Sequence, residues 1–317
     1  MKYYAEQEQE IRRYEVIHTT VKDITCTFDE NGYLTGGTLP HTLRLMLHVA
    51  MTYLWEGSPE KTEYANKILH NYLDGEGFCH FSPFLCMQIF FRFYDKLDGE
   101  AVQKMDAYCL RWMDAETEPA LEVIGCNDNY PFMAAGALLG AALRYNRKDY
   151  LEAVVLRMQQ TEEMLKRNGF TSEYTSNTYT PIQALCLSEI AEFAATPERF
   201  TKRMLSGEEK EILTEIHRQA LEAEYHVHRD LLTHMHWETA QLGGACSRGY
   251  ARDVAAATSH ARFLYYMLYG KELLIDPLEG IMQEGTADRI SHNDDDFLRL
   301  MFAWHAMATY HCPTELA

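Results

Sequence analysis

Helical periodicity runs through most of the chain and constrains its fold more than any other feature. In the segment 41–55, HTLRLMLHVAMTYLW, apolar residues recur at spacings of three and four and stop before Gly57. The start signal Ser58-Pro59-Glu60 begins a second helix, which we expect to run to about Leu73. Eight more segments share this periodicity: 84–97, 99–114, 130–145, 149–168, 181–194, 207–224, 255–274 and 294–310. The sequence therefore predicts an all-α fold of about ten helices of ordinary length.

Two segments depart from this periodicity. The segment 17–36 contains the turn signal Asn31-Gly32, which predicts a short N-terminal β-hairpin. The segment 225–238 is rich in histidine and threonine, and it could be extended rather than helical. No low-complexity linker divides the chain, so we expect one domain that spans residues 1–317.

The loops between the expected helices are of two kinds. Some, such as 146–148, only turn the chain between paired helices. Others are longer and carry many polar and aromatic side chains: 78–83, 125–130, 169–181 and 226–253. If the helices pair as antiparallel hairpins wound in a ring, the second kind gathers at one end of the fold. The pattern favours an (α/α) toroid of antiparallel helical hairpins, complete or incomplete.

Charge and composition restrict the partners and the location of the protein. The formal net charge is −18 and no basic face is evident, which argues against nucleic acid as a partner. No segment approaches a membrane span, and the first residues contain no apolar run of the kind found in signal peptides. The eight cysteines are scattered without a CxxC pair, which indicates free thiols. We expect a cytoplasmic protein with no nucleic-acid or membrane partner; the sequence leaves the oligomeric state open.

The segment 226–253 holds the densest group of candidate functional residues. Four histidines lie within eleven positions, and cationic and aromatic residues follow; the group comprises His226, His228, His234, His236, Arg248, Tyr250 and Arg252. Histidines that change charge near neutral pH and donor-rich arginines are suited to binding an anionic substrate. The pair His234 and His236 could also ligate a metal ion. Because no CxxC or HExxH motif accompanies the pair, we expect no metal and no cofactor.

Two other loops contribute candidates. In the loop 125–130, Asn127 or Asn129 could hydrogen-bond a substrate carboxylate or hydroxyl, while Asp128 or Asn129 could cap the following helix. The loop 169–181 precedes another helix, and a threonine could cap that helix in the same way. Its polar and aromatic side chains exceed what capping requires; the candidates are Glu173, Tyr174, Asn177 and Tyr179.

The hairpin series and two stretches, GFTSEYTSNTYTPIQAL and QLGGACSRGYARD, resemble the α/α-toroid (six-hairpin) carbohydrate-active proteins. These include heparinase- and alginate-lyase-like polysaccharide lyases, and the resemblance covers most of the chain. The chain departs from their pattern at Asn177, where proline is usual, and at Ala245-Cys246, where Pro-His usually precedes the serine and arginine. Such lyases usually continue into a β-sandwich domain, which we do not expect in this chain.

The resemblance implies a lyase that binds an acidic oligosaccharide and cleaves it by β-elimination. It implies Asn129 or Asn127 as the group that neutralises the substrate carboxylate, and Tyr179 or Tyr174 as base or acid. His236 would be their partner in proton transfer. The remaining substrate contacts would come from Glu173, Asn177, His234, Glu238, Arg248, Tyr250 and Arg252, with Arg248 as the anchor.

Two alternatives remain open from the sequence. A glycoside hydrolase would need two carboxylates on either side of the glycosidic bond. The candidates for such a pair are Asp128, Glu173, Glu238 and Asp253. A non-catalytic sugar-binding or assembly module is the other alternative, and the missing histidine before Ser247 favours it.

Overall fold

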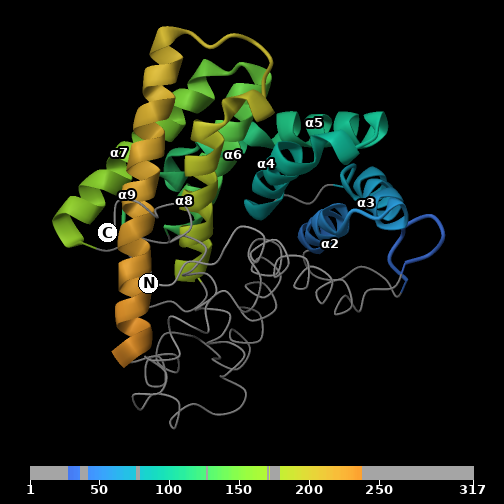
Figure 1. Ribbon diagram of the computed structural model, residues 1–317, viewed down its shortest axis with the longest axis horizontal. Helices are drawn as coiled ribbons and strands as arrows, with labels where there is room; N and C mark the ends of the chain where they lie inside the picture. The colour runs from blue at the N-terminus through green and yellow to red at the C-terminus, as the bar shows by residue number, and fades with distance from the viewer. Residues whose placement is uncertain are drawn as a thin grey trace, which may run out of the picture.

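The computed structural model describes residues 28–35, 42–75, 79–125, 128–169, 171 and 179–237. Helices make up 80% of these residues and no strand forms among them, so the predicted all-α class is confirmed for this part of the chain. The α-helices are α2 (Thr42–Glu56), α3 (Pro59–Tyr72), α4 (Phe81–Phe93), α5 (Gly99–Trp112), α6 (Asn129–Tyr145), α7 (Lys148–Asn168), α8 (Tyr179–Ala195) and α9 (Gly207–Trp237) (Figure 1). Short 3-10 helices are η1 (Tyr94–Lys96), η2 (Met113–Thr117), η3 (Pro119–Leu121) and η4 (Pro197–Arg199).

The first eight predicted helices match α2 to α9, with ends that differ by a few residues except in α9. The prediction that 225–238 could be extended is wrong, because α9 continues to Trp237. Ala220 and Ala223 are buried, and Val227, beyond the expected end at 224, continues the same buried face at helical spacing; this packing outweighs the weak helix propensity of the histidines. The expected helices 255–274 and 294–310 lie outside the described residues.

The Asn-Gly turn is present, but the β-hairpin predicted around it is not confirmed. Phe28 and Leu34 form an isolated antiparallel bridge, and Gly32 has a φ of 83° in the turn between them. The turn packs on α3: the Asn71 side-chain amide donates to the carbonyl of Asn31 at 2.8 Å. The rest of the segment 17–36 lies almost entirely outside the described residues.

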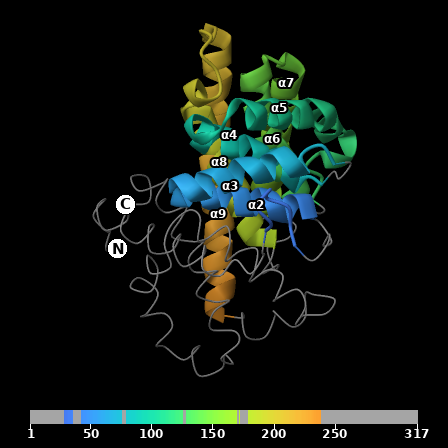
Figure 2. The ribbon, with the colours of Figure 1, turned by 90° about the vertical axis from the view of Figure 1, so that its right-hand side faces the viewer.

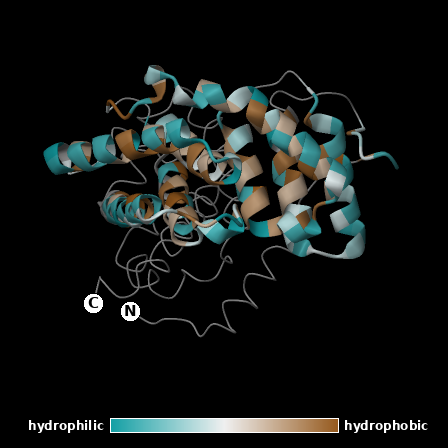
Figure 3. Ribbon diagram, turned by 90° about the horizontal axis from the view of Figure 1, so that it is seen from above, coloured by the Kyte–Doolittle hydropathy of each residue, from teal (hydrophilic) through white to brown (hydrophobic). Residues whose placement is uncertain are grey.

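The eight helices form two layers. The inner helices α2, α4, α6 and α8 contact one another in chain order, and each also packs against an outer helix or its 3-10 neighbour (Figures 1 and 2). Every residue from 131 to 143 of α6 is buried, whereas the outer helix α7 buries one face, at positions 150, 151, 154, 157, 158, 161, 164 and 165. Figure 3 shows the corresponding pattern, with hydrophobic residues where helices pack and hydrophilic residues on outward faces. Within the described residues, no helix is both long and apolar enough to cross a membrane.

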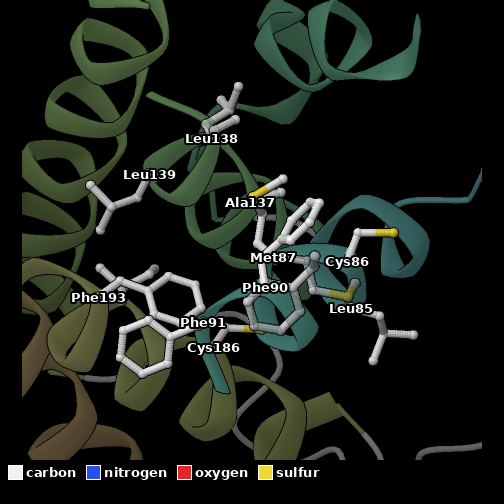
Figure 4. Close-up of a cluster of buried hydrophobic side chains, with 14 of the residues drawn as sticks. Leu85, Cys86, Met87, Phe90, Phe91, Ala137, Leu138, Leu139, Cys186 and Phe193 are labelled. Atoms are coloured by element: carbon white, nitrogen blue, oxygen red, sulfur yellow. The ribbon is translucent and has the colours of Figure 1, made fainter. Parts of the chain in front are cut away.

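The inner helices α4 and α6 run in the same direction. Phe84 packs against Gly136, and one turn further along both helices Met87 packs against Gly140. Figure 4 shows Phe91 of α4 beside Phe193 of α8. The centroids of these two rings are 4.7 Å apart, so α4 also packs against α8. The links that precede α4 and α6 therefore lie at the same end of the fold.

The outer helices return the chain in the opposite direction. In the α8–α9 hairpin, His217 Nδ1 lies 2.9 Å from the carbonyl oxygen of Ala191, and Glu224 hydrogen-bonds Ser188 further back along α8. The short α6–α7 turn and the start of α9 border a shared cavity of about 330 Å³. The short turns that join an inner helix to the next outer helix thus lie at one end of the fold. The beginnings of the inner helices lie at the other end.

Gly136→Ala should lower the free energy of unfolding by about 1–2 kcal/mol, because overpacking outweighs the gain in helix propensity. The new Cβ would lie 2.5 Å from Cε2 of the buried Phe84 ring. Gly140→Ala should cost less, since the flexible Met87 side chain can move. Urea denaturation measures the change, with Gly99→Ala as the control because nothing lies within 4 Å of its Cβ. Equal stability of Gly136→Ala and Gly99→Ala would contradict the proposed close packing.

Candidate functional site

Two aromatic rings lie together at the end where α4 and α6 begin. His80 immediately precedes α4, and Tyr130 is the second residue of α6. Their ring centroids are 4.8 Å apart. Tyr130 is 37% exposed and the His80 side chain 26%, so a molecule bound at this end could reach both rings.

His80 is paired with a buried carboxylate. Its Nδ1 lies 3.0 Å from Oε2 of Glu116, a residue of η2 that is fully buried where η2 packs on α6. Burial raises the pKa of Glu116, while the hydrogen bond and positive charge of His80 and the charge of Arg157 oppose that rise. A buried carboxylate that fixes the orientation of a partly exposed imidazole is an arrangement suited to proton transfer.

A cation from the outer layer completes this group, which we call the His80 site: His80, Glu116, Tyr130 and Arg157. The guanidinium of Arg157 on α7 donates to the backbone carbonyl of Glu116, and the side chain is buried. Burial lowers the pKa of Arg157 to about 10, so the group stays positively charged at neutral pH. The site therefore combines a buried carboxyl group and a buried cation behind a partly exposed histidine.

Of the residues predicted from the sequence, Asn129 lies closest in the chain to this site. It is the first residue of α6 and fully buried, as is the preceding Asp128. Of the two predicted capping residues, Asp128 occupies the N-cap position of α6, but its side chain makes no capping hydrogen bond to the helix. Burial also removes Asp128 from the carboxylates accessible to a glycosidic bond.

Most other predicted site residues fall where side chains are not described. Tyr179 begins α8, and His234 and His236 lie in the last turns of α9, but their side chains are outside the described set. Those wholly outside the described residues are Asn127, Glu173, Tyr174, Asn177, Glu238, Arg248, Tyr250 and Arg252.

Helical structure changes the interpretation of the His-x-His pair. Residues two apart on an α-helix lie about 200° apart around its axis, so His234 and His236 do not share a face as they would on a strand. Among the residues that the structure describes, no group of three or more histidine, cysteine or acidic side chains is placed to hold a metal ion.

His226, another member of the histidine group, lies elsewhere. It lines a cavity of about 210 Å³ between α7 and α9, together with Glu162, Lys166, Gln219 and Glu222. The described part of the chain therefore does not bring His226 into the His80 site.

The sequence did not single out the residues of the His80 site. His80 falls in the predicted polar loop 78–83, and this position was its only signal. Glu116 lies 36 residues from His80 and 41 from Arg157 in the sequence. Its sequence neighbours are acidic, as in an ordinary solvent-exposed segment. Only the packing of η2 and α7 brings these three residues together.

A second group of buried charges joins α4, α8 and α9. Arg92 on α4 donates to Glu189 at 2.7 Å and to Glu192 at 2.6 Å, both on α8. Glu224 on α9 is buried close enough to Glu189 for the two charges to repel each other. Burial raises the pKa of Glu189 to about 7, and it raises that of Glu224 well above its usual range.

Comparisons with known protein families, with curated proteins and with solved structures found no match for this chain.

The buried carboxylates should make stability fall as pH rises. Because folding raises the pKa of Glu189 and Glu224, their protons favour the folded state at about pH 5, and this stabilisation is lost as pH passes 7. The free energy of unfolding should fall by on the order of 1–3 kcal/mol between pH 5 and pH 8. Glu224→Gln should reduce that fall, since only one of the two carboxylates can then ionise.

Thermal and urea unfolding across this pH range measure the effect. Glu222→Gln is the matched control, because Glu222 lies on the same helix but is half exposed and paired with Arg218. An unchanged pH dependence in Glu224→Gln would show that the buried pair does not govern stability.

Proposed function

We propose that this chain is a carbohydrate-active enzyme that binds an acidic oligosaccharide and cleaves it by β-elimination, with the His80 site taking part in proton transfer. The observation that carries the proposal is the pairing of partly exposed His80 with fully buried Glu116 beside the exposed ring of Tyr130. Abstraction of a proton next to a carboxylate needs an oriented base, and this pair is one.

The proposed fold is an (α/α) toroid with a short N-terminal β-hairpin. The layered packing supports it: inner helices follow one another in chain order, and outer helices complete each hairpin. The predicted helices 255–274 and 294–310 would continue the series. In such a ring the inner helices are parallel, so all their N-terminal ends lie on the side of the His80 site.

Electrostatics at this end supports an anionic substrate. The N-terminus of a helix carries a partial positive charge, and the parallel α4 and α6 direct two such ends to one place. The buried Arg157 adds a full positive charge behind them. The exposed face of Tyr130 offers an apolar surface on which a sugar ring could stack. These features suit a uronate better than a neutral sugar.

In the proposed reaction, Glu116 holds Nδ1 of His80, so proton exchange with the substrate falls to Nε2. The family resemblance supplies the remaining roles: Tyr179 or Tyr174 as a second proton carrier with His236, and Asn129 or Asn127 near the substrate carboxylate. No cofactor is required for this chemistry. We also propose a cytoplasmic location, which the free thiols of the described cysteines support.

The proposal is tested by incubating the protein with a panel of acidic oligosaccharides. Elimination leaves an unsaturated uronyl end that absorbs ultraviolet light, and we expect at least one substrate to yield this absorbance. His80→Gln and Glu116→Gln should lower kcat by about 100-fold or more while KM changes little, because the proton carrier is needed mainly in the transition state. Tyr179→Phe should abolish the absorbance and leave binding nearly intact.

His70→Gln is the matched control and should keep full activity. His70 also pairs with a carboxylate, Asp98 at 2.8 Å, but this pair lies between α3 and α5. New reducing ends without ultraviolet absorbance would show hydrolysis instead. Binding without either product would leave a non-catalytic sugar-binding module as the better account.

A further inference from the structure

Arg157 is an unusual residue for an outer helix. On an outer helix a long cationic side chain normally keeps its charged end in water. Arg157, however, is only 2% exposed and is the largest of the fully buried side chains among the described residues. Its Nη1 atom is buried and has no hydrogen-bond partner among the described residues. Burying a guanidinium in this way costs free energy, and an apolar side chain of similar volume would fill the space at lower cost.

Within the described residues, the hydrogen bond and the charge interactions of Arg157 involve one segment, the link between α5 and α6. Its guanidinium donates to the backbone carbonyl of Glu116, and its charge acts on Glu116 and Glu122. Three positions further along α7, on the same face, Gln160 accepts from the backbone N–H of Val123 at 2.9 Å and donates to Glu122 at 2.7 Å. These two residues of α7 therefore fasten both ends of the segment 116–123.

The two side chains that hold the segment 116–123, Gln160 and Arg157, differ in charge. Gln160 is neutral and hydrogen-bonds the backbone of Val123 and the carboxylate of Glu122. Arg157 hydrogen-bonds the backbone carbonyl of Glu116 and also carries a positive charge, which favours the ionised form of the Glu116 carboxyl. The charged groups that act on Glu116 come from three elements: His80 before α4, Arg157 on α7 and Glu118 on its own segment. Burial and Glu118 favour the neutral acid; His80 and Arg157 favour the ionised form.

We propose that Arg157 is a positioning residue for the His80 site: its buried positive charge keeps Glu116 ionised and in place as the partner of His80. This inference rests on the proposed role of His80 in proton transfer. It assigns different roles to the two residues: Gln160 holds the backbone of the segment in place, and Arg157 supplies the positive charge that acts on the Glu116 carboxyl. Without Arg157, Glu116 would take up a proton more readily and lose the charge that orients the imidazole.

The titration of Glu116 tests this proposal in the full-length protein. Its carboxyl carbon is observed by NMR in protein labelled with 13C-glutamate, and its signal is identified by its loss in Glu116→Gln. In Arg157→Gln, which keeps a hydrogen-bond donor but not the charge, the midpoint should shift to higher pH. Arg157→Lys, which restores the charge, should return the midpoint close to that of the unmodified protein.

Gln160→Met is the matched comparison, because it loosens the other end of the same segment without changing charge. It should lower stability yet leave the Glu116 midpoint where it was. A shift of equal size in Gln160→Met and Arg157→Gln, or no shift in Arg157→Gln, would overturn the proposal and leave Arg157 with a purely structural role. Arg157→Met serves the same purpose as Arg157→Gln if the latter does not fold.

This measurement does not depend on activity. If the Glu116 titration responds as expected but no acidic oligosaccharide is cleaved, the positioning role stands and the proposed function fails. If cleavage is observed but the titration does not respond, the function stands and the inference about Arg157 fails.

Discussion

The close approach of α4 and α6 is the constraint on which the described structure depends. Gly136 and Gly140 leave room for Phe84 and Met87 directly against the backbone of α6, where any larger residue would force the helices apart. This contact fixes the two helices in a parallel arrangement, and α6 in turn packs against α7, α8 and η2. The positions of His80 and Glu116, one before α4 and the other on η2, follow from that single interface.

Charged side chains buried between helices are a second recurring feature of the described structure. Two of the buried acids interact with a cation from another helix: Glu189 on α8 pairs with Arg92 on α4, and the charge of Arg157 on α7 acts on Glu116, whose backbone carbonyl accepts from its guanidinium. Such pairs add little net stability, because desolvation offsets their attraction. They do make the packing specific, since a wrongly docked helix would bury a charge without its partner. The same low-dielectric surroundings move the pKa values of these groups away from their usual range.

The sequence predicted the helices well because their periodicity is strong, and it predicted the candidate site poorly because that site is made of distant residues. Helix α3 begins where the start signal at Ser58 predicts. The serine hydroxyl caps the helix by accepting a hydrogen bond from the backbone N–H of Lys61. The end of α9 could not be predicted, because the helix continues past 224 with Val227 buried, through a segment of weak helix propensity. Glu116 and Arg157 carry no local pattern at all; their pairing exists only once α7 has docked on the α5–α6 link.

That dependence on docking has a consequence for how the protein folds. A single helical hairpin can form from local contacts alone, but the grouping of His80, Glu116 and Arg157 needs two successive hairpins, α4–α5 and α6–α7. The charged groups of these residues therefore lose their hydration only when those hairpins pack together. Partly folded chains keep these groups hydrated and apart. The imidazole of His80 therefore acquires its complete surroundings only after the α6–α7 hairpin has docked on the α4–α5 hairpin.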